Sequence, residues 1–317
     1  MLIKTALCDL LNIKYPLLQG AMAWIAGGRL AAAVSQAGGL GIIGAGSADC
    51  IWIKQEIDLL RQLTDKPFAV NLMLGSPHIH EVVDLVIREK VPVVTSGGGN
   101  PGPYIERLKQ AEIKIIPVVA SVALAKRLSR LGADALIAEG TESGGHVAEM
   151  TTMCLVPMVV DAVAIPVIAA GGIADGRGFM AALALGAQGV QIGTRFICAE
   201  ECNVHPVYQE KVIKALDRDT VVCGTSTGHP VRAIHNKFTR AYLQSEKAGM
   251  SKEDLEEMGR GRYPAAAVHG DLVSGSILAG QICGLVNKVQ PAADIIADIF
   301  KDAEQVLQRL EEQRCQD

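Results

Sequence analysis

The segment I165-P-V-I-A-A-G-G-I-A-D175, followed by G189-V-Q-I-G-T-R195, contains the pattern that decides the fold. Each begins as a short apolar run of strand length and reaches glycine where the run ends. Strands that are apolar throughout are typical of parallel sheets, which are covered by helices on both faces. This pair therefore predicts two buried parallel strands whose glycines lie in the loops at the strand ends.

Six earlier runs of the same kind precede this pair. They span residues 15–20, 40–46, 68–74, 91–97, 114–121 and 135–140. Segments of helical period with charges on one face separate them, for example at 28–37, 51–63, 80–89 and 122–131. Eight strands alternating with helices by about residue 196 predict a (β/α)8 TIM barrel. A doubly wound sheet remains the alternative, because periodicity does not show whether a sheet closes on itself.

The region after the eighth run breaks this rhythm. Residues 197–268 are richer in charge, have helical patterns at 205–216, 231–248 and 251–258, and lack strong strand signals. We expect a barrel over 1–196, a small helical insertion over 197–268 that forms a substrate lid near the barrel mouth, and a return to the barrel over 269–317. An amphipathic pattern at 292–312 predicts a terminal helix.

Composition excludes several classes of function. The net charge of the 317 residues is −4 and no long basic run occurs, which argues against a nucleic-acid surface or a membrane-binding helix. The eight cysteines form no C-x-x-C pair, so we interpret them as reduced thiols. The N-terminus resembles neither a signal segment nor a spanning helix. We therefore expect a cytoplasmic protein.

Polar and glycine residues at the ends of the runs predict a site, because barrel enzymes build their sites from the loops after the strands. Gly171, Gly172, Gly193 and Thr194 follow the last two strands, where barrel enzymes commonly bind phosphate through bare backbone N–H groups; ordinary tight turns are the alternative. Asn71 and Gln191 interrupt apolar strands. They would contact a bound heterocycle, or else each other or the backbone.

A lone histidine ends the stretch E139-G-T-E-S-G-G-H146 after the sixth strand. At the mouth it would donate a proton or hold a carbonyl oxygen, whereas in a surface loop it would do neither. The other histidines show no metal-ligand spacing, so we expect no metal site. The string G39-L-G41-I-I-G44 matches a dinucleotide motif, but its glycines follow a helix and then enter a strand, which indicates a structural role.

Several of these motifs recur together in a known family. They are Q19-G-A-M-A-W24, V70-N71, T95-S-G-G98, A138-E-G-T-E-S-G-G-H146, V190-Q-I-G-T-R-F196, G228-H-P-V-R-A-I234, and H269-G-D with G280-Q281. In order and spacing the chain resembles the FMN-dependent enoyl-acyl-carrier-protein reductase II family, which is related to the nitronate monooxygenases. The resemblance spans nearly the whole chain.

The resemblance implies an FMN site at the barrel mouth. The phosphate would lie on the loops of Gly171, Gly172, Gly193 and Thr194. The remaining cofactor contacts would be Gly20, Ala21, Met22, Ala23, Asn71, Ser96, Glu139, Gly145, Gln191 and Gln281. His146 occupies the position of the family's active-site histidine and would face the substrate over the flavin.

The resemblance also implies a reaction. NADH or NADPH would reduce FMN, and flavin N5 would then deliver hydride to the β-carbon of an enoyl thioester in fatty acid elongation. A proton would reach the α-carbon from His146 or water. The thioester would arrive on acyl carrier protein, an acidic partner, and Arg232, Lys237 and Arg240 would form a basic lip that steers it. A solvated helix face is the other interpretation of these charges. Barrels of this kind often form homodimers, which is a separate expectation.

Two alternatives remain open. A nitronate monooxygenase would use a similar histidine as a base before oxygen reacts at the flavin. The stretch H146-V-A-E-M-T-T152 resembles the reductase pattern more closely. A flavin-free barrel that binds a phosphorylated ligand, as an isomerase or a binding module, is the second alternative, and it predicts a colourless protein.

Overall fold

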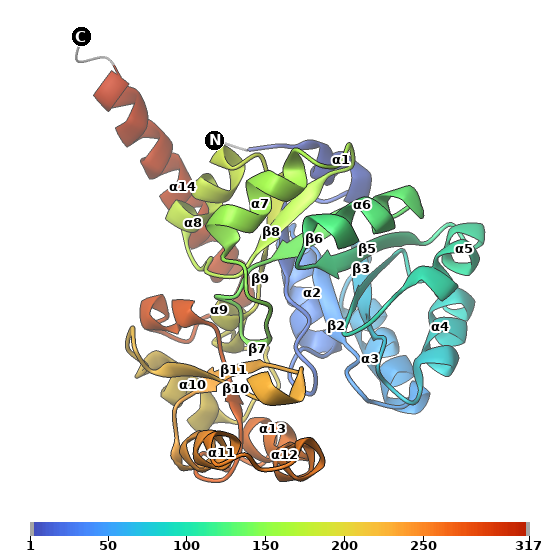
Figure 1. Ribbon diagram of the computed structural model, residues 1–317. Coiled ribbons are helices and arrows are strands. Elements are labelled where there is room, and N and C mark those ends of the chain that lie inside the picture. The colour runs from blue at the N-terminus through green and yellow to red at the C-terminus, as the bar shows by residue number, and fades with distance from the viewer. Residues whose placement is uncertain (1–2, 315–317) are drawn as a thin grey trace.

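The computed structural model describes residues 3–314, and its larger sheet is a parallel barrel of eight strands (Figure 1). The strands are β1 (Leu17–Gln19), β2 (Gly41–Gly44), β3 (Phe68–Met73), β4 (Val93–Gly97), β5 (Lys114–Val119), β6 (Leu136–Glu139), β8 (Val167–Ala170) and β9 (Gly189–Ile192). β1 pairs with β9, and a bridge between Leu18 and Leu40 connects β1 to the start of β2. The sheet therefore closes, which confirms the barrel and excludes the open doubly wound sheet.

Helices alternate with these strands, and most of them cover the outside of the barrel, whereas the first helix packs Leu7 and Leu11 into the cluster inside it. They are α1 (Ala6–Leu11), α2 (Gly28–Gln36), α3 (Cys50–Leu63), α4 (Ile79–Arg88), α5 (Gly102–Gln110), α6 (Val122–Arg130), α7 (Thr152–Val160), α8 (Gly176–Ala184), α9 (Thr194–Ile197) and α14 (Ala292–Arg314). Side-chain caps fix several starts, since Asp49, Ser121 and Asp175 accept hydrogen bonds from the first-turn N–H groups of α3, α6 and α8. The helices predicted from periodicity are confirmed.

The interior of the barrel changes character from one layer to the next. Alternate residues of each strand point inward, and the lower layers are an apolar cluster that includes Leu18, Ile42 and Ile137. One pleat nearer the carboxyl ends, the inward positions become polar on four strands, at Asn71, Thr95, Glu139 and Gln191. The barrel is therefore packed below and offers polar groups above.

The G39-L-G41-I-I-G44 string has the structural role that the sequence indicated. α2 ends at Gln36, and Gly41 begins β2. A β-carbon on Gly41 would collide with the backbone of Ala31 in α2. The glycine thus permits close packing of helix on strand, and the string does not open a helix as a dinucleotide motif would.

A second, antiparallel sheet lies beside the barrel mouth, and this was not predicted. Its strands are β7 (Gly145–His146), β10 (Thr220–Cys223), β11 (Val231–Ile234) and β12 (Ile277–Leu278). β11 pairs with the other three strands. The insertion over 197–268 was expected to be helical, and it contains the strands β10 and β11 besides its helices. The small sheet was missed because β11 pairs with β7 and β12, which come from segments far from it in sequence, and such long-range pairing leaves no local pattern.

The helices of the insertion surround this small sheet. They are α10 (Pro206–Ile213), α11 (Lys237–Lys247), α12 (Lys252–Gly259) and α13 (Arg262–Ala267), with short 3₁₀ turns at Thr225–Thr227 and Gln281–Leu285. The helix expected over 231–248 begins only at Lys237, because Val231–Ile234 forms β11. Figure 1 shows α11, α12 and α13 together on the side of the small sheet away from the barrel.

The terminal helix α14 returns to the barrel, as predicted. Its first half packs on α8 and α2, and Gly176 of α8 lies against the backbone near Ala303. Its second half projects away from the body (Figure 1). Within residues 3–314, no helix has both the length and the apolarity that a membrane crossing requires.

Candidate active site

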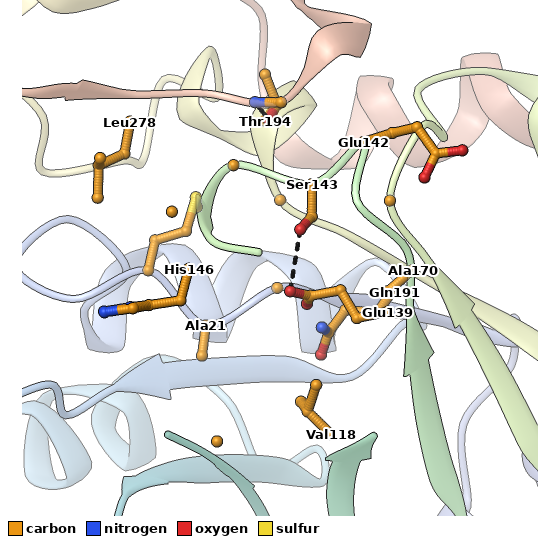
Figure 2. Close-up of a pocket in the computed structure, with 18 of the residues that line it drawn as sticks. Ala21, Val118, Glu139, Glu142, Ser143, His146, Ala170, Gln191, Thr194 and Leu278 are labelled. Atoms are coloured by element: carbon orange, nitrogen blue, oxygen red, sulfur yellow. Dashed lines mark hydrogen bonds between the residues drawn. The ribbon is translucent and has the colours of Figure 1, made fainter. Parts of the chain in front are cut away.

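A cavity of about 340 Å³ opens at the carboxyl ends of the barrel strands, between the barrel and the small sheet. Figure 2 shows side chains from both parts facing it. The predicted site residues on its wall are Gly20, Ala21, Met22, Ala23, Asn71, Glu139, Gly145, His146, Gly171, Gly172, Gln191, Gly193 and Thr194. Residues at the carboxyl ends of five barrel strands, β1, β3, β6, β8 and β9, therefore meet, as the barrel prediction required.

The barrel strands supply a polar floor to this cavity. Asn71 Nδ2 donates to Thr95 Oγ1 at 3.0 Å, and Ser143 Oγ donates to Glu139 Oε1 at 3.0 Å (Figure 2). Burial raises the pKa of the Glu139 carboxyl to about 7, although the Ser143 hydrogen bond opposes this shift. Near neutral pH the floor therefore offers both hydrogen-bond donors and acceptors, which suits the edge of a heterocycle.

A group of glycines forms one end of the cavity. Gly171 and Gly172 have φ of +94° and +71°, a region that favours glycine. A β-carbon on Gly193 would have no protein atom within 4 Å, so this backbone is bare toward the cavity. The open peptide group of Gly193, beside the left-handed turn at Gly171 and Gly172, fits the phosphate of the FMN that the resemblance implies.

Glu142 lies near the same glycines and was missed by the sequence analysis. Both of its carboxylate oxygens accept from the Thr152 backbone N–H, at 3.0 and 2.9 Å, at the start of α7. A β-carbon on Gly172 would be 3.4 Å from the Glu142 β-carbon. The negative charge of Glu142 therefore interacts with the positive end of α7. This interaction weakens the repulsion between Glu142 and an anion bound at the glycines.

His146 faces the cavity from the small sheet. As part of β7 it pairs with Val231, and Val147 N–H donates to Pro230 at 3.0 Å. Its side chain is solvent-accessible through the cavity, while surrounding protein partly buries the ring. That burial, followed by repulsion from His229, lowers the pKa of His146. The imidazole is therefore neutral at pH 7, able to accept a proton or to donate one N–H hydrogen bond.

Ser96 and Gln281 do not line the cavity, although both were predicted to contact the cofactor. Inward and outward positions alternate along β4, and Thr95 pairs with Asn71 on the inward side. Ser96 therefore points out toward the helices, where its hydroxyl is buried without a partner among residues 3–314. The Gln281 side chain is exposed, because the 3₁₀ turn directs it outward while its N–H donates to Glu142 O.

The structure adds six apolar residues and one tyrosine to the wall that the sequence did not identify. They are Met73, Val118, Ile173, Ile197, Tyr263, Leu278 and Ile282. Inward alternation along β3 and β5 accounts for Met73 and Val118. Tyr263 and Leu278 come from α13 and β12, whose approach to the barrel depends on the small sheet. The cavity thus joins a polar floor to an apolar side.

The predicted basic lip is only partly present. Arg232 is buried, with its Nε donating to Thr141 O at 3.0 Å and its guanidinium to Thr220 Oγ1 at 3.3 Å. It therefore fastens β11 to the loop after β6 and is not available to a partner. Lys237 and Arg240, on α11, are exposed. Across the described chain, no group of three or more metal-binding side chains occurs.

Comparison with known proteins agrees with this geometry. The family model for nitronate monooxygenase matches residues 4–82 and 75–302. The chain belongs to the nitronate monooxygenase family. A probable nitronate monooxygenase of Staphylococcus saprophyticus is 34% identical, with 98% of this chain and 100% of the relative covered. Members of this family also carry other names, since a relative from Rhodococcus jostii, 32% identical over 95% of this chain and 96% of its own, is an indene-carboxyl-CoA dehydrogenase.

Solved structures provide a nearer match. FabK from Thermotoga maritima is 51% identical, with a TM-score of 0.96, and the alignment covers 98% of this chain and 99% of that one. The nitroalkane oxidase of Streptomyces ansochromogenes is 28% identical, with a TM-score of 0.82 over 96% and 100% of the two chains. Within the family, the chain is therefore much more similar to FabK than to this nitroalkane oxidase.

Proposed function

We propose that this protein is an FMN-dependent enoyl-acyl-carrier-protein reductase that uses NADH or NADPH to reduce the trans-2 double bond of the enoyl thioester. The observation that carries the proposal is the 51% identity to FabK over nearly the whole chain. In this chain, His146 faces a cavity whose end is formed by Gly171, Gly172 and Gly193, called the glycine cradle below. Bound FMN would supply the two-electron chemistry between nicotinamide and thioester.

The residues of the cavity have distinct tasks in this proposal. The bare backbone at Gly193 would hold the phosphate together with the turn at Gly171 and Gly172, and Thr194 would add its hydroxyl, whose oxygen already accepts from Gly280 N–H at 2.9 Å. Asn71, Glu139 and Gln191 would contact the ring, because amide and carboxyl groups match its alternating donors and acceptors. These contacts would orient the cofactor and exclude water from below.

His146 would manage a proton on the substrate side. Its lowered pKa leaves the ring neutral at pH 7, so it would position the thioester by an N–H hydrogen bond or pass on a proton taken from solvent. The apolar wall of Met73, Leu278 and Ile282 would accept the acyl chain. Exposed Lys237 and Arg240 would attract acyl carrier protein to this side of the molecule.

An anaerobic titration tests this proposal. The purified protein should show a flavin spectrum that NADH or NADPH bleaches and that a crotonyl thioester then restores without oxygen. A colourless protein that binds no added FMN would instead support the flavin-free alternative. A flavin that nicotinamide bleaches but thioester never restores would contradict the reductase.

Nitronate monooxygenase activity is the second candidate, and the state of His146 favours it as a specific observation. A neutral imidazole in a cavity can act as the base that removes a proton from a nitroalkane. The same titration separates the two functions. Bleaching by an alkyl nitronate, together with indifference to both nicotinamide nucleotides, would assign the protein to the monooxygenases.

A further inference from the structure

Most polar side chains on the cavity wall already have hydrogen-bond partners. Asn71 bonds Thr95, Ser143 bonds Glu139, Glu142 bonds Thr152, and Thr194 bonds Gly280. Within the part of the chain that the structure describes, three side chains on the wall make no hydrogen bond, namely His146, Gln191 and Tyr263. Polar groups left unpaired on an otherwise satisfied wall indicate where a ligand bonds.

These three groups lie on two different sides of the cavity. Gln191 belongs to β9 and forms part of the barrel floor. His146 and Tyr263 are instead held by the small sheet, since His146 lies on β7 and α13, which carries Tyr263, packs against β12. A substrate bound above a flavin on the floor would therefore meet His146 and Tyr263.

The environment of Tyr263 suits a fixed hydrogen-bond donor. Its ring packs against the main hydrophobic core, and Ser276 N–H donates to Arg262 O at 2.8 Å, which attaches the start of α13 to the segment before β12. Burial, together with the nearby Cys202, raises the pKa of the Tyr263 phenol well above its usual range. The hydroxyl therefore remains protonated and keeps its hydrogen available to a ligand.

We propose that Tyr263 is a second catalytic residue, whose hydroxyl donates a hydrogen bond to the carbonyl oxygen of the enoyl thioester. This inference rests on the proposed function and assigns a residue to a step that it leaves open. The neutral His146 cannot supply a full positive charge to that oxygen. Tyr263 is the remaining unpaired donor on the same side of the cavity within the described chain.

The reaction balances with this assignment. Hydride addition at the β-carbon moves the carbon–carbon π electrons toward the carbonyl, and negative charge develops on its oxygen. The Tyr263 hydroxyl stabilises that charge and keeps its own proton. One proton then bonds the α-carbon, either from water or from the His146 N–H while the other ring nitrogen takes a proton from water, and the carbonyl reforms. A donor placed where negative charge develops typically accelerates such steps by about 10²–10³-fold.

The test compares Tyr263→Phe with a matched control, Tyr208→Phe. The Tyr208 hydroxyl donates to Leu278 O at 2.8 Å and is buried in the core, so its loss removes a structural hydrogen bond. Tyr263→Phe removes a hydroxyl that bonds nothing in the described protein. Each variant is studied by anaerobic stopped-flow absorbance in two reactions. The first is bleaching of the flavin by NADH or NADPH, and the second is recovery of the flavin absorbance with a crotonyl thioester.

We expect Tyr263→Phe to slow recovery by at least tenfold while bleaching and FMN affinity stay unchanged. A second readout uses the oxidised holoenzyme and a thioester labelled with ¹³C at the carbonyl. Its infrared stretch should shift to higher frequency in Tyr263→Phe than in the wild type, because the hydrogen bond is lost. Tyr208→Phe should lower thermal stability and leave the infrared band in place.

The outcomes distinguish a failure of the proposed role of Tyr263 from a failure of the proposed reductase function. Unchanged recovery, or equal slowing of both reactions by Tyr263→Phe, would overturn the role of Tyr263 while leaving the reductase intact. An infrared band that does not move would do the same. If the wild-type flavin is never restored by thioester, the proposed function fails and the role of Tyr263 fails with it.

Discussion

The two sides of the cavity differ in how they are built. The floor comes from the carboxyl ends of three barrel strands spaced around the sheet, β3, β6 and β9, where Asn71, Glu139 and Gln191 point inward. The other side comes from β7, β11, α13 and β12, which approach one another only through the small sheet. His146 and Tyr263 lie on that second side. In the proposed function, the surface that binds the cofactor would thus be part of the barrel, whereas the surface that binds the substrate would be an addition to it.

This difference suggests a division of labour. A rigid barrel mouth gives one geometry for a ring and its phosphate, because its strands are fixed by pairing on both sides. The small sheet depends on short pairings, two residues long at β7 and at β12. Changes on the floor should therefore affect cofactor binding, and changes on the opposite side should affect catalysis.

The largest expected effect is on the substrate side. We expect His146→Ala to leave FMN bound and to reduce turnover of the enoyl thioester by about 10²–10⁴-fold, the usual contribution of a positioned acid or base. Steady-state kinetics and the flavin spectrum of the variant provide the measurement. A variant with undiminished turnover would remove His146 from the chemistry, and one that loses its flavin would blur the division between the two sides.

The second prediction concerns the glycine cradle. Gly193 has φ of −101°, which other residues adopt, and its β-carbon would project into open cavity. We therefore expect Gly193→Leu to fold normally but to bind FMN at least tenfold more weakly, because the side chain would occupy the phosphate position. Gly193→Ala serves as the graded control, with a smaller loss. Equal FMN affinity in the leucine variant and the wild type would contradict the cradle.

The third prediction concerns the Glu139 carboxyl of the floor and is made for the cofactor-free protein. Its pKa is raised from 4.5 to about 7 on folding, so between these values the native state binds more protons than the unfolded chain. The free energy of unfolding should therefore fall as pH rises from 4.5 through 7, by roughly 3 kcal/mol from this group. Denaturant titrations across this range should show that Glu139→Gln lacks this slope.

Its control is Glu149→Gln, on an exposed position of the following loop. That variant should keep the wild-type dependence of stability on pH. If Glu139→Gln also keeps it, the slope comes from another group and the floor does not contain a protonated carboxyl at neutral pH.

The smallest expected effect concerns the partner. Reversing the two exposed charges of α11, Lys237→Glu with Arg240→Glu, should raise KM for thioester on acyl carrier protein several-fold at low salt, because the partner is acidic. KM for a short crotonyl thioester should not change. Added salt should diminish the difference between variant and wild type, and a parallel rise in both KM values would argue against docking at α11.

Much of the floor could be predicted from the sequence, and little of the other side could. Asn71 and Gln191 were recognisable because a polar residue inside a buried strand must face a partner. Ser96 was predicted to contact the cofactor, but successive side chains of β4 point to opposite faces. Thr95 therefore points inward and Ser96 points toward the helices. Arg232 was interpreted as surface charge because its strand, β11, has no partner within the insertion except β10. Its burial follows from pairing with β7 and β12.

The sequence by itself determined the alternation of eight strands with helices, the glycines after the last two strands and the position of His146 after the sixth strand, because strand period, helix period and turn chemistry are local properties. Only the tertiary structure decided which residues share the cavity with His146. Tyr263 and Leu278 lie more than a hundred residues beyond it and reach the cavity through β-pairing and helix packing. Those contacts depend on the closed barrel beneath them, which no local pattern describes.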